Sequence, residues 1–298
     1  MWIADNWKFY EIIDTSDGEK LERWGDYILL RPDPQVLWSM EKKNPAWKHI
    51  NGHYHRSSKG GGDWEFFSLP EQWDIRYDLR IGKRLTFNLK PFAFKHTGLF
   101  PEQAVNWEWF SGLIAREKEK HPDRKLKVLN LFAYTGGATV AAAAAGAEVT
   151  HVDAAKGMVT WARENAVSSG LGEAPIRWLV DDCVKFVERE LRRGNHYDGI
   201  IMDPPSYGRG PKGEIWKLEE KIHAFIRLTS ELLTKDSLFF LVNSYTTGLA
   251  PAVLTYMIST EVAGKFPGTV EAQEIGLPVT ETGLVLPCGA AGRWQKKD

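Results

Sequence analysis

The stretch VLNLFAYTGGATV at residues 128–140 decides the fold predicted from this sequence. Val128 to Phe132 is a short apolar run, as expected for a buried strand. Gly136 and Gly137 permit a tight turn in which backbone N–H groups can approach a ligand. The small residues Ala138 to Ala145 favour a helix that packs closely on a sheet. Strand, glycine-rich turn and helix together predict a nucleotide-binding unit of an α/β fold, with a ligand-free turn as the alternative.

Two later segments extend this pattern, THVDAAKGM at 150–158 and VDDCVKFV at 180–187. Asp153 ends the second predicted strand, roughly 20 residues after the glycines, where a carboxylate can accept ribose hydroxyls. Its alternative role is to cap the helix expected at 154–168. After the third strand, Asp182 is the better candidate to meet an adenine amino group, and Asp181 is the candidate helix cap. The spacing is not GxGxxG, so a dinucleotide cofactor is the weaker interpretation.

The fourth segment, DGIIMDPPSYGRG at 198–210, is where chemistry is expected. In Asp203-Pro204-Pro205-Ser206 the two prolines fix φ and remove two N–H donors. We therefore expect the Asp203 carboxylate and nearby carbonyls to face the cofactor pocket. Such acceptors suit the N–H of a planar amine or the cationic end of a cofactor. A rigid strand-to-loop turn without a ligand is the alternative.

Residues 95–210 resemble the class I methyltransferases that modify large-subunit ribosomal RNA, a group containing cytosine carbon-5 and guanine N7 enzymes. The resemblance is carried by HTGLFPEQ at 96–103, NLFAYTGG at 130–137, Asp153, Asp182 and Asp203-Pro204-Pro205. The carbon-5 enzymes carry a nucleophilic cysteine after the strand that here is expected at 237–242. No cysteine lies in that strand or in the Asn243-Ser244-Tyr245 directly after it, and Ala104 stands where the family usually has arginine. Carbon-5 methylation needs a thiolate and is therefore disfavoured, and Cys183 and Cys288 are expected to be packed and unreactive.

The resemblance implies S-adenosylmethionine as the cofactor, no metal, and direct transfer of a methyl group to a base nitrogen in RNA. The residues expected to bind the cofactor are Thr97, Phe100, Glu102, Gln103, Phe132, Ala133, Tyr134, Thr135, Gly136, Gly137, Asp153, Ala154, Met158, Asp181, Asp182, Cys183 and Asp203. The expected catalytic residues are Asp203, Pro204, Pro205, Ser206 and Tyr207, with Tyr207 stacking on the acceptor ring. A small-molecule or protein substrate, an oxidoreductase and a non-catalytic binder are the alternatives.

The chain is expected to divide near residue 90 into two domains. Residues 1–90 show short alternating runs that predict a small β-rich domain. Residues 91–298 are expected to form a Rossmann-like α/β domain, with a seven-stranded, mostly parallel sheet that ends in an antiparallel hairpin. Helices are expected at 101–120, 215–233 and 251–262, and the hairpin strands at 269–275 and 283–286.

Composition adds limits on location and partners. Two cysteines do not make a disulfide framework, and no run approaches the roughly 18 apolar residues of a membrane span, so a cytoplasmic enzyme is expected. The net charge of −1 gives little support for nucleic-acid binding. However, residues 42–62 hold five Lys/Arg, three His and no acid, with Trp47 and Tyr54 interleaved.

We expect the segment 42–62 to contact single-stranded RNA, with a solvated loop as the alternative. The basic, glycine-rich loop at 207–213 is expected to be a second contact and a mobile lid.

Overall fold

The computed structural model describes residues 1–57, 61–92, 95–209, 215–246 and 248–297. Its centre is an eight-stranded sheet in the order β1-β16-β17-β15-β12-β9-β10-β11, in which β9, β10, β11, β12 and β15 are parallel and β17 is antiparallel to both neighbours. The strands are β1 (Trp2–Ile3), β9 (Lys127–Leu131), β10 (Glu148–Asp153), β11 (Ile176–Val180), β12 (Gly199–Met202), β15 (Phe239–Ser244), β16 (Gly268–Pro278) and β17 (Val285–Lys296). This confirms the predicted seven-stranded sheet with its closing hairpin, and β1 adds an eighth strand beside β16.

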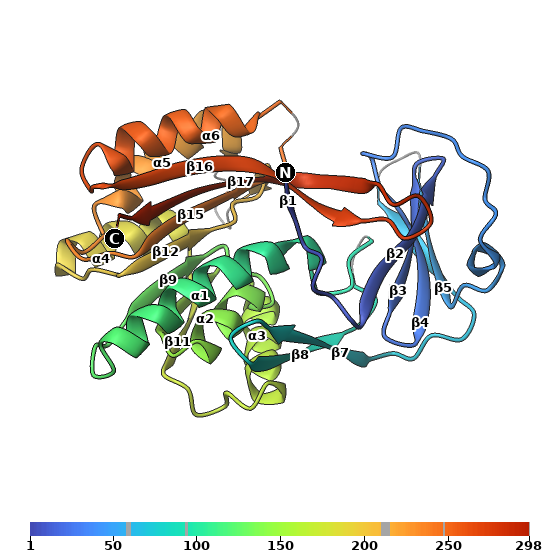
Figure 1. Ribbon diagram of the computed structural model, residues 1–298, viewed down its shortest axis with the longest axis horizontal. Helices are drawn as coiled ribbons and strands as arrows, with labels where there is room; N and C mark the ends of the chain where they lie inside the picture. Colours follow the sequence, from blue (N-terminus) through green and yellow to red (C-terminus); the bar gives the residue numbers. More distant parts are fainter. Residues whose placement is uncertain (58–60, 93–94, 210–214, 247, 298) are drawn as a thin grey trace.

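Helices cover both faces of this sheet (Figure 1). One face packs on α1 (Ala104–Lys120), α2 (Gly137–Ala144) and α3 (Lys156–Ser168); the other packs on α4 (Cys183–Arg193), α5 (Leu218–Ser230) and α6 (Pro251–Ile258). Short turns of helix lie at η2 (Pro101–Gln103) and η3 (Ser259–Ala263). Strand residues alternate between two cores, with Val128 and Ile201 in one and Leu129 and Ile200 in the other, because successive side chains of a strand point to opposite faces.

Two predicted elements have different bounds in the structure. The helix expected from residue 215 begins at Leu218, because Ile215–Lys217 is strand β14 and pairs antiparallel with β13 (Tyr207–Arg209). The predicted lid at 207–213 is therefore strand-paired over its first three residues, and residues 210–213 lie outside the described part of the chain. Within the described part, no helix is both long and apolar enough to span a bilayer.

The N-terminal part forms a separate five-stranded sheet and a hairpin. The sheet contains β2 (Tyr10–Ser16), β3 (Glu19–Trp24), β4 (Tyr27–Pro32), β5 (Gly52–Arg56) and β6 (Gly62–Phe66), with the turn η1 (Pro45–Lys48) before β5; the hairpin is β7 (Trp73–Leu79) and β8 (Lys83–Leu89).

Strand pairing and hydrogen bonds join this part to the large sheet and its helices, as three examples show. Strand β1 lies in the large sheet, Asn88 of β8 donates its N–H to Asn165 of α3 at 2.8 Å, and the N–H of Thr280, just past β16, donates to the carbonyl of Ile12 at 2.9 Å. Figure 1 shows β16 and β17 reaching toward the small sheet. The division near residue 90 stays a prediction, since these contacts cross it.

Candidate active site

The candidate site lies at the carboxyl ends of the parallel strands. From β9 the chain continues to β10 and β11 on one side, and it returns to form β12 and β15 on the other. The loops that leave β9 and β12 therefore diverge, and they open a crevice at this point of the sheet. Such a reversal of strand order is where open α/β sheets bind ligands. The two loops are the glycine-rich turn after Leu131 and the Asp203-Pro204-Pro205 turn after Met202.

The glycine-rich turn is held in an unusual backbone conformation. Phe132, Tyr134 and Gly136 have φ of 55°, 50° and 80°, in the left-handed region that L side chains disfavour. Hydrogen bonds hold the strained turn: Ala133 N–H donates to the Val152 carbonyl at 3.1 Å. Glycine is required at 136, because a Cβ there would lie 2.8 Å from the Cβ of Ala162. Strain of this kind is concentrated at binding sites.

Asp153 fixes the glycine-rich turn from the end of β10. Its Oδ2 accepts the N–H of Tyr134 at 2.8 Å, and its Oδ1 accepts the N–H of Ala155 at 2.8 Å. Burial raises the pKa of this carboxyl, while the two N–H donors oppose the shift. Each oxygen keeps a further lone pair for a ligand hydroxyl. The ribose contact at Asp153 stays a prediction.

Of the two acids after β11, Asp182 and not Asp181 caps the following helix. Asp182 is the N-cap of α4 and accepts the Lys185 N–H at 2.9 Å. Asp181 accepts the Asp182 N–H at 2.9 Å and forms an ion pair with Arg189. The assignment of the cap to Asp181 was wrong, because the residue with extended backbone next to the first helical residue is Asp182. An adenine contact at either acid stays a prediction.

A narrow cavity joins the loops after β9 and β12. It collects eight of the predicted cofactor residues: Phe100, Gln103, Phe132, Ala133, Tyr134, Thr135, Gly137 and Asp203. It is also lined by residues outside the predicted cofactor set: Leu99, Trp107, Asn130, Ala138, Ile201 and Asn243. The enclosed space is only about 50 Å³, so a ligand of nucleoside size would also lie over the ends of β10 and β11. Ala154, Met158, Asp181, Asp182 and Cys183 follow those strands outside the cavity, and Thr97 and Glu102 are buried without lining it.

One lining residue has an unused hydrogen-bonding group. The Tyr134 hydroxyl is buried and has no hydrogen-bond partner among the described residues. Its ring lies 5.4 Å from that of Phe100, centroid to centroid. Because a buried polar atom without a partner is costly, this hydroxyl fits a site that a polar ligand completes.

A buried polar network lies behind the cavity, and of its members only Gln103 was predicted from the sequence. Gln103 donates its amide nitrogen to the Tyr245 hydroxyl at 2.6 Å, and its Oε1 accepts from Asn243 at 3.0 Å and from Asn106 at 2.9 Å. Arg293 in turn donates to Asn106 Oδ1 at 2.6 Å. These bonds fix the orientation of the Gln103 amide and hold the Tyr245 hydroxyl beside the site. The available signal was Asn243-Ser244-Tyr245 directly after an apolar strand, at the place of the missing cysteine.

The segment before η2 is anchored by the small sheet. Arg31 of β4 donates to the Lys95 carbonyl at 2.8 Å, and Lys95 donates its Nζ to the Pro32 carbonyl at 2.9 Å. Arg31 also forms a buried ion pair with Glu22, with Nε and Oε2 2.6 Å apart. Burial lowers the pKa of Lys95 to about 8, with Lys20 adding to the shift. The small sheet therefore helps to place Phe100 and Gln103 in the site.

Asp203, the predicted catalytic carboxylate, lines the cavity, and its catalytic role stays a prediction. The carboxyl is half-buried, burial raises its pKa to about 7, and the nearby Glu102 carboxylate adds to the shift. The carbonyl of Pro205 accepts from Trp216 Nε1 at 2.7 Å, and that of Ser206 accepts the Leu218 N–H at 3.0 Å. Each of these two carbonyls keeps a second lone pair, so a ligand contact at the carbonyls of this turn stays a prediction. Pro204 is buried and keeps the turn rigid.

Ser206 and Tyr207 lie at the outer side of this turn. Both side chains are exposed, and Tyr207 is 50 % exposed. Ser206 Oγ accepts a hydrogen bond from Thr246 Oγ1 at 2.7 Å. Stacking of Tyr207 on an acceptor ring stays a prediction.

Neither cysteine is suited to act as a nucleophile. Cys183 is 4 % exposed, its Sγ accepts the Phe132 N–H at 3.3 Å, and burial raises its pKa. Cys288 is half-buried, and its pKa is raised by burial and by the Glu102 carboxylate. Because the thiolate is the reactive form, both environments oppose covalent attack.

The described part of the basic segment, residues 42–57 and 61–62, is folded and partly neutralised, and Lys59 lies outside the described residues. Lys42 lies 3.3 Å from Asp17 Oδ2, and Lys43 lies 3.1 Å from Glu41 Oε2. Tyr54 is only 3 % exposed, so it cannot stack on a base as expected. Lys48 and Arg56 are exposed, and the exposed aromatic rings nearby are those of Phe66 and Phe67.

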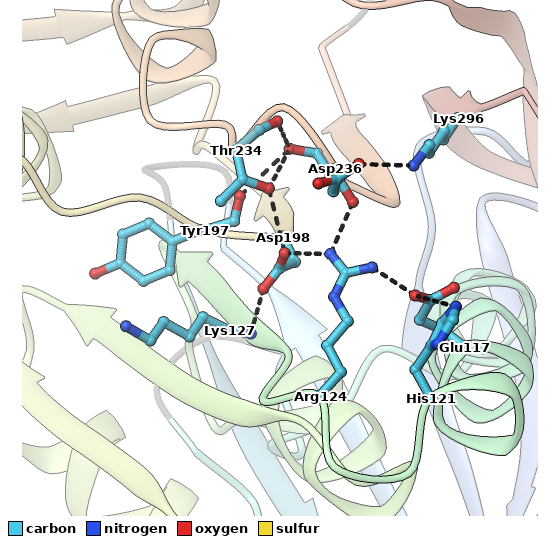
Figure 2. Close-up of polar contacts among 10 residues, drawn as sticks. Glu117, His121, Arg124, Lys127, Tyr197, Asp198, Thr234, Asp236 and Lys296 are labelled. Atoms are coloured by element: carbon cyan, nitrogen blue, oxygen red, sulfur yellow. Dashed lines mark hydrogen bonds and ion pairs between the residues drawn. The ribbon is translucent and has the colours of Figure 1, made fainter.

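A pocket much larger than the candidate cavity lies at the opposite end of the sheet. It measures about 750 Å³ and is lined by charged residues at the amino ends of β9, β12 and β15. Figure 2 shows its Arg124 guanidinium between Asp198, Glu117 and Asp236. Arg124 donates to the carboxylates of Asp198 and Glu117 and to the backbone carbonyl of Asp236, over 2.7, 2.5 and 2.9 Å. These contacts tie α1 to the loops before β12 and β15. Size alone therefore does not mark the candidate site.

Comparison with known proteins identifies similar sequences and folds. A family model described as S-adenosylmethionine-dependent methyltransferase matches residues 41–264. The crystal structure of the SAM-dependent methyltransferase from Agrobacterium tumefaciens is 37 % identical, with a TM-score of 0.88, and the match covers 99 % of this chain and 93 % of that one. A methyltransferase solved in complex with SAH shares the fold, at 21 % identity and a TM-score of 0.70, covering 96 % and 75 %.

Curated relatives are longer proteins. Ribosomal RNA large subunit methyltransferase K/L of Pseudoalteromonas atlantica is 34 % identical over 249 residues, covering 76 % of this chain and 33 % of the relative. The protein of the same name from Cellvibrio japonicus is 32 % identical over 190 residues, covering 61 % and 23 %. The chain thus spans a third or less of the length of these two relatives.

Proposed function

Because this chain belongs to the S-adenosylmethionine-dependent methyltransferase family, we propose that it methylates a base nitrogen in RNA, with ribosomal RNA as the substrate. The cofactor of the family is S-adenosylmethionine. The observation that carries the proposal for nitrogen is the Asp203 carboxyl beside the cavity, with a pKa raised to about 7, in a site without a reactive thiol. Support for RNA comes from the curated relatives named ribosomal RNA large subunit methyltransferases.

The bound cofactor supplies a methyl group already activated on its sulfonium. Asp203 then has two tasks: it accepts the N–H of the acceptor and takes up the proton that transfer releases. A base works best when its pKa is near the working pH, which the environment of Asp203 provides. The rigid Pro204-Pro205 turn keeps the carboxylate in place, and positioning of this kind can supply several kcal/mol, up to about 7–11 in ideal cases.

The acceptor base is assigned to a pocket next to Tyr245. This pocket measures about 320 Å³ and includes Ser244, Tyr245, Thr246 and, from the small domain, Gln35. Thr246 bonds to Ser206 beside the catalytic turn, and Tyr245 bonds to Gln103 of the cofactor cavity. The pocket is within the size range of small-ligand sites. A base in duplex RNA would have to flip out to enter it.

Around this centre we assign the untested residues as follows. Asp153 binds the ribose, and Phe100, Gln103, Tyr134 and Asp203 surround the methionine end of the cofactor. The adenine lies over the ends of β10 and β11 among Ala154, Met158, Asp181, Asp182 and Cys183. The RNA backbone crosses the small domain at Lys48 and Arg56, with Phe66 and Phe67 available for base stacking.

Transfer of label from the cofactor tests the proposal. Purified protein is incubated with labelled S-adenosylmethionine and, separately, with total RNA, with total protein and with a small-molecule extract of cells. Label is expected in RNA, and Asp203→Asn should reduce it while cofactor binding persists. Label confined to protein or to small molecules would reject RNA as the substrate.

A further inference from the structure

Three strands of the small domain bring two histidines and two carboxylates together. His53 and His55 are two apart on β5, so their side chains leave the same face, and their ring centroids lie 3.8 Å apart. Glu65 of β6 stands directly opposite His53 and bonds to His55 Nε2 at 2.8 Å. Glu19 of β3 reaches across to His53 Nε2, also at 2.8 Å.

These groups have the composition of a transition-metal site. Ligand atoms of His53, His55 and Glu65 all lie within 4.8 Å of one another, and they form the one such group of three or more metal-binding side chains found in the described part of the chain. Imidazole nitrogens with carboxylate oxygens are the donors that suit Zn²⁺. Zn–N and Zn–O bonds are about 2.0–2.2 Å long, so rotation of these partly exposed side chains can bring all of them to an ion placed between the rings.

The surroundings allow an ion but do not force one. His53 and Glu19 are shielded, with side chains 19 % and 25 % exposed, while His55 and Glu65 are about half exposed. Lys42 lies 3.7 Å from Glu19 Oε2 and competes for that carboxylate, but its Nζ is closer to Asp17 at 3.3 Å. Glu19 can therefore turn to an ion while Lys42 keeps a partner.

From this geometry we propose that His53, His55, Glu65 and Glu19 bind a divalent transition-metal ion, with Zn²⁺ as the best match. The ion would link β3 to the β5–β6 hairpin and stabilise the small sheet. None of these four residues lines the cofactor cavity or the pocket assigned to the acceptor base, and the proposal does not depend on the proposed RNA substrate.

Titration with Zn²⁺ tests this site directly. Full-length protein freed of metal by a chelator competes with a chromophoric chelator for Zn²⁺, and Co²⁺ absorption reports the ligand geometry. The wild type should bind a single Zn²⁺ ion. His55→Ala and Glu65→Gln, both at exposed side chains, should each weaken binding by at least roughly tenfold. His49→Ala changes an exposed histidine of the same segment outside the group and should leave binding unchanged.

Unaltered S-adenosylmethionine affinity in all variants shows that they are folded. Failure of the wild type to take up Zn²⁺, or equal affinity in the His55, Glu65 and His49 variants, would overturn the proposal.

Discussion

Because the pKa of Asp203 is raised, we expect the affinity for the cofactor to depend on pH before methyl transfer but not after it. S-adenosylmethionine carries a positive sulfonium, whereas the product S-adenosylhomocysteine does not. The ordinary pKa of an aspartate is 3.8, and burial brings that of Asp203 to about 7. A cation in the cavity favours the ionised carboxylate, so it lowers this pKa again. Each unit by which the cation lowers the pKa of Asp203 corresponds to about 1.4 kcal/mol of binding free energy, or tenfold in affinity.

The size of the effect follows from the pH window. At about pH 8.5 Asp203 is already ionised and binding needs no proton release. At about pH 5.5, roughly 1.5 units below the pKa, most of the free enzyme is protonated, so binding of the sulfonium must expel the proton. The affinity for S-adenosylmethionine should thus fall roughly tenfold, and at most about thirtyfold, over this window. The affinity for S-adenosylhomocysteine should not fall with it.

Calorimetric titrations of both ligands across this window check the prediction. Asp203→Asn cannot ionise and should remove the difference in pH dependence between the two ligands. Parallel curves for the two ligands in the wild type would refute the placement of Asp203 near the sulfonium. The free energy of unfolding of the ligand-free protein should change with pH in the opposite direction. It should fall as pH rises between 3.8 and about 7, because the unfolded chain releases the Asp203 proton at a lower pH than the folded protein does.

Three further outcomes are expected. Asp153→Ala should cost about 2–4 kcal/mol of cofactor affinity, through loss of a charged hydrogen-bond acceptor and of the bonds that hold the glycine-rich turn; unchanged affinity by calorimetry in a folded variant would exclude the ribose role. The double change Cys183→Ala, Cys288→Ala should keep most activity, and loss of turnover with intact cofactor binding would instead indicate a covalent mechanism. Lys48→Ala with Arg56→Ala should weaken RNA binding and flatten its salt dependence by up to about one unit of slope per lost contact, as measured by filter binding.

Lys43→Ala is the matched control for the RNA prediction. Lys43 is also exposed but pairs with Glu41 at 3.1 Å, so its loss should change the salt slope less. Equal affinity and slope for the wild type and the double variant would leave this surface without an RNA contact.

The predictable part of the fold was the part encoded locally. Short stretches restrict their own backbone: the apolar run that begins at Val128, the glycines at 136 and 137, and the prolines at 204 and 205. The positions of Asp153 and Asp203 at strand ends could therefore be predicted from local sequence. Gln103 and Asn243 could not be joined in this way, because their hydrogen bond links residues 140 positions apart.

The ion pairs of the basic segment could not be predicted either, because their partners are distant in the sequence. Residues 42–62 contain no acid, yet Lys42 is neutralised by Asp17 and Glu19. These two acids lie between β2 and β3 and at the start of β3. The cap at Asp182 depended on which of two adjacent acids adopts the extended backbone, a choice that composition does not fix.

Product analysis of methylated RNA tests the central claim most directly. Ribosomal RNA treated with the enzyme and labelled S-adenosylmethionine is digested to nucleosides and analysed by mass spectrometry. The account predicts label in a base methylated on nitrogen, and loss of that product with Asp203→Asn. Label in 5-methylcytosine, or none in RNA while another class of molecule is methylated, would contradict it.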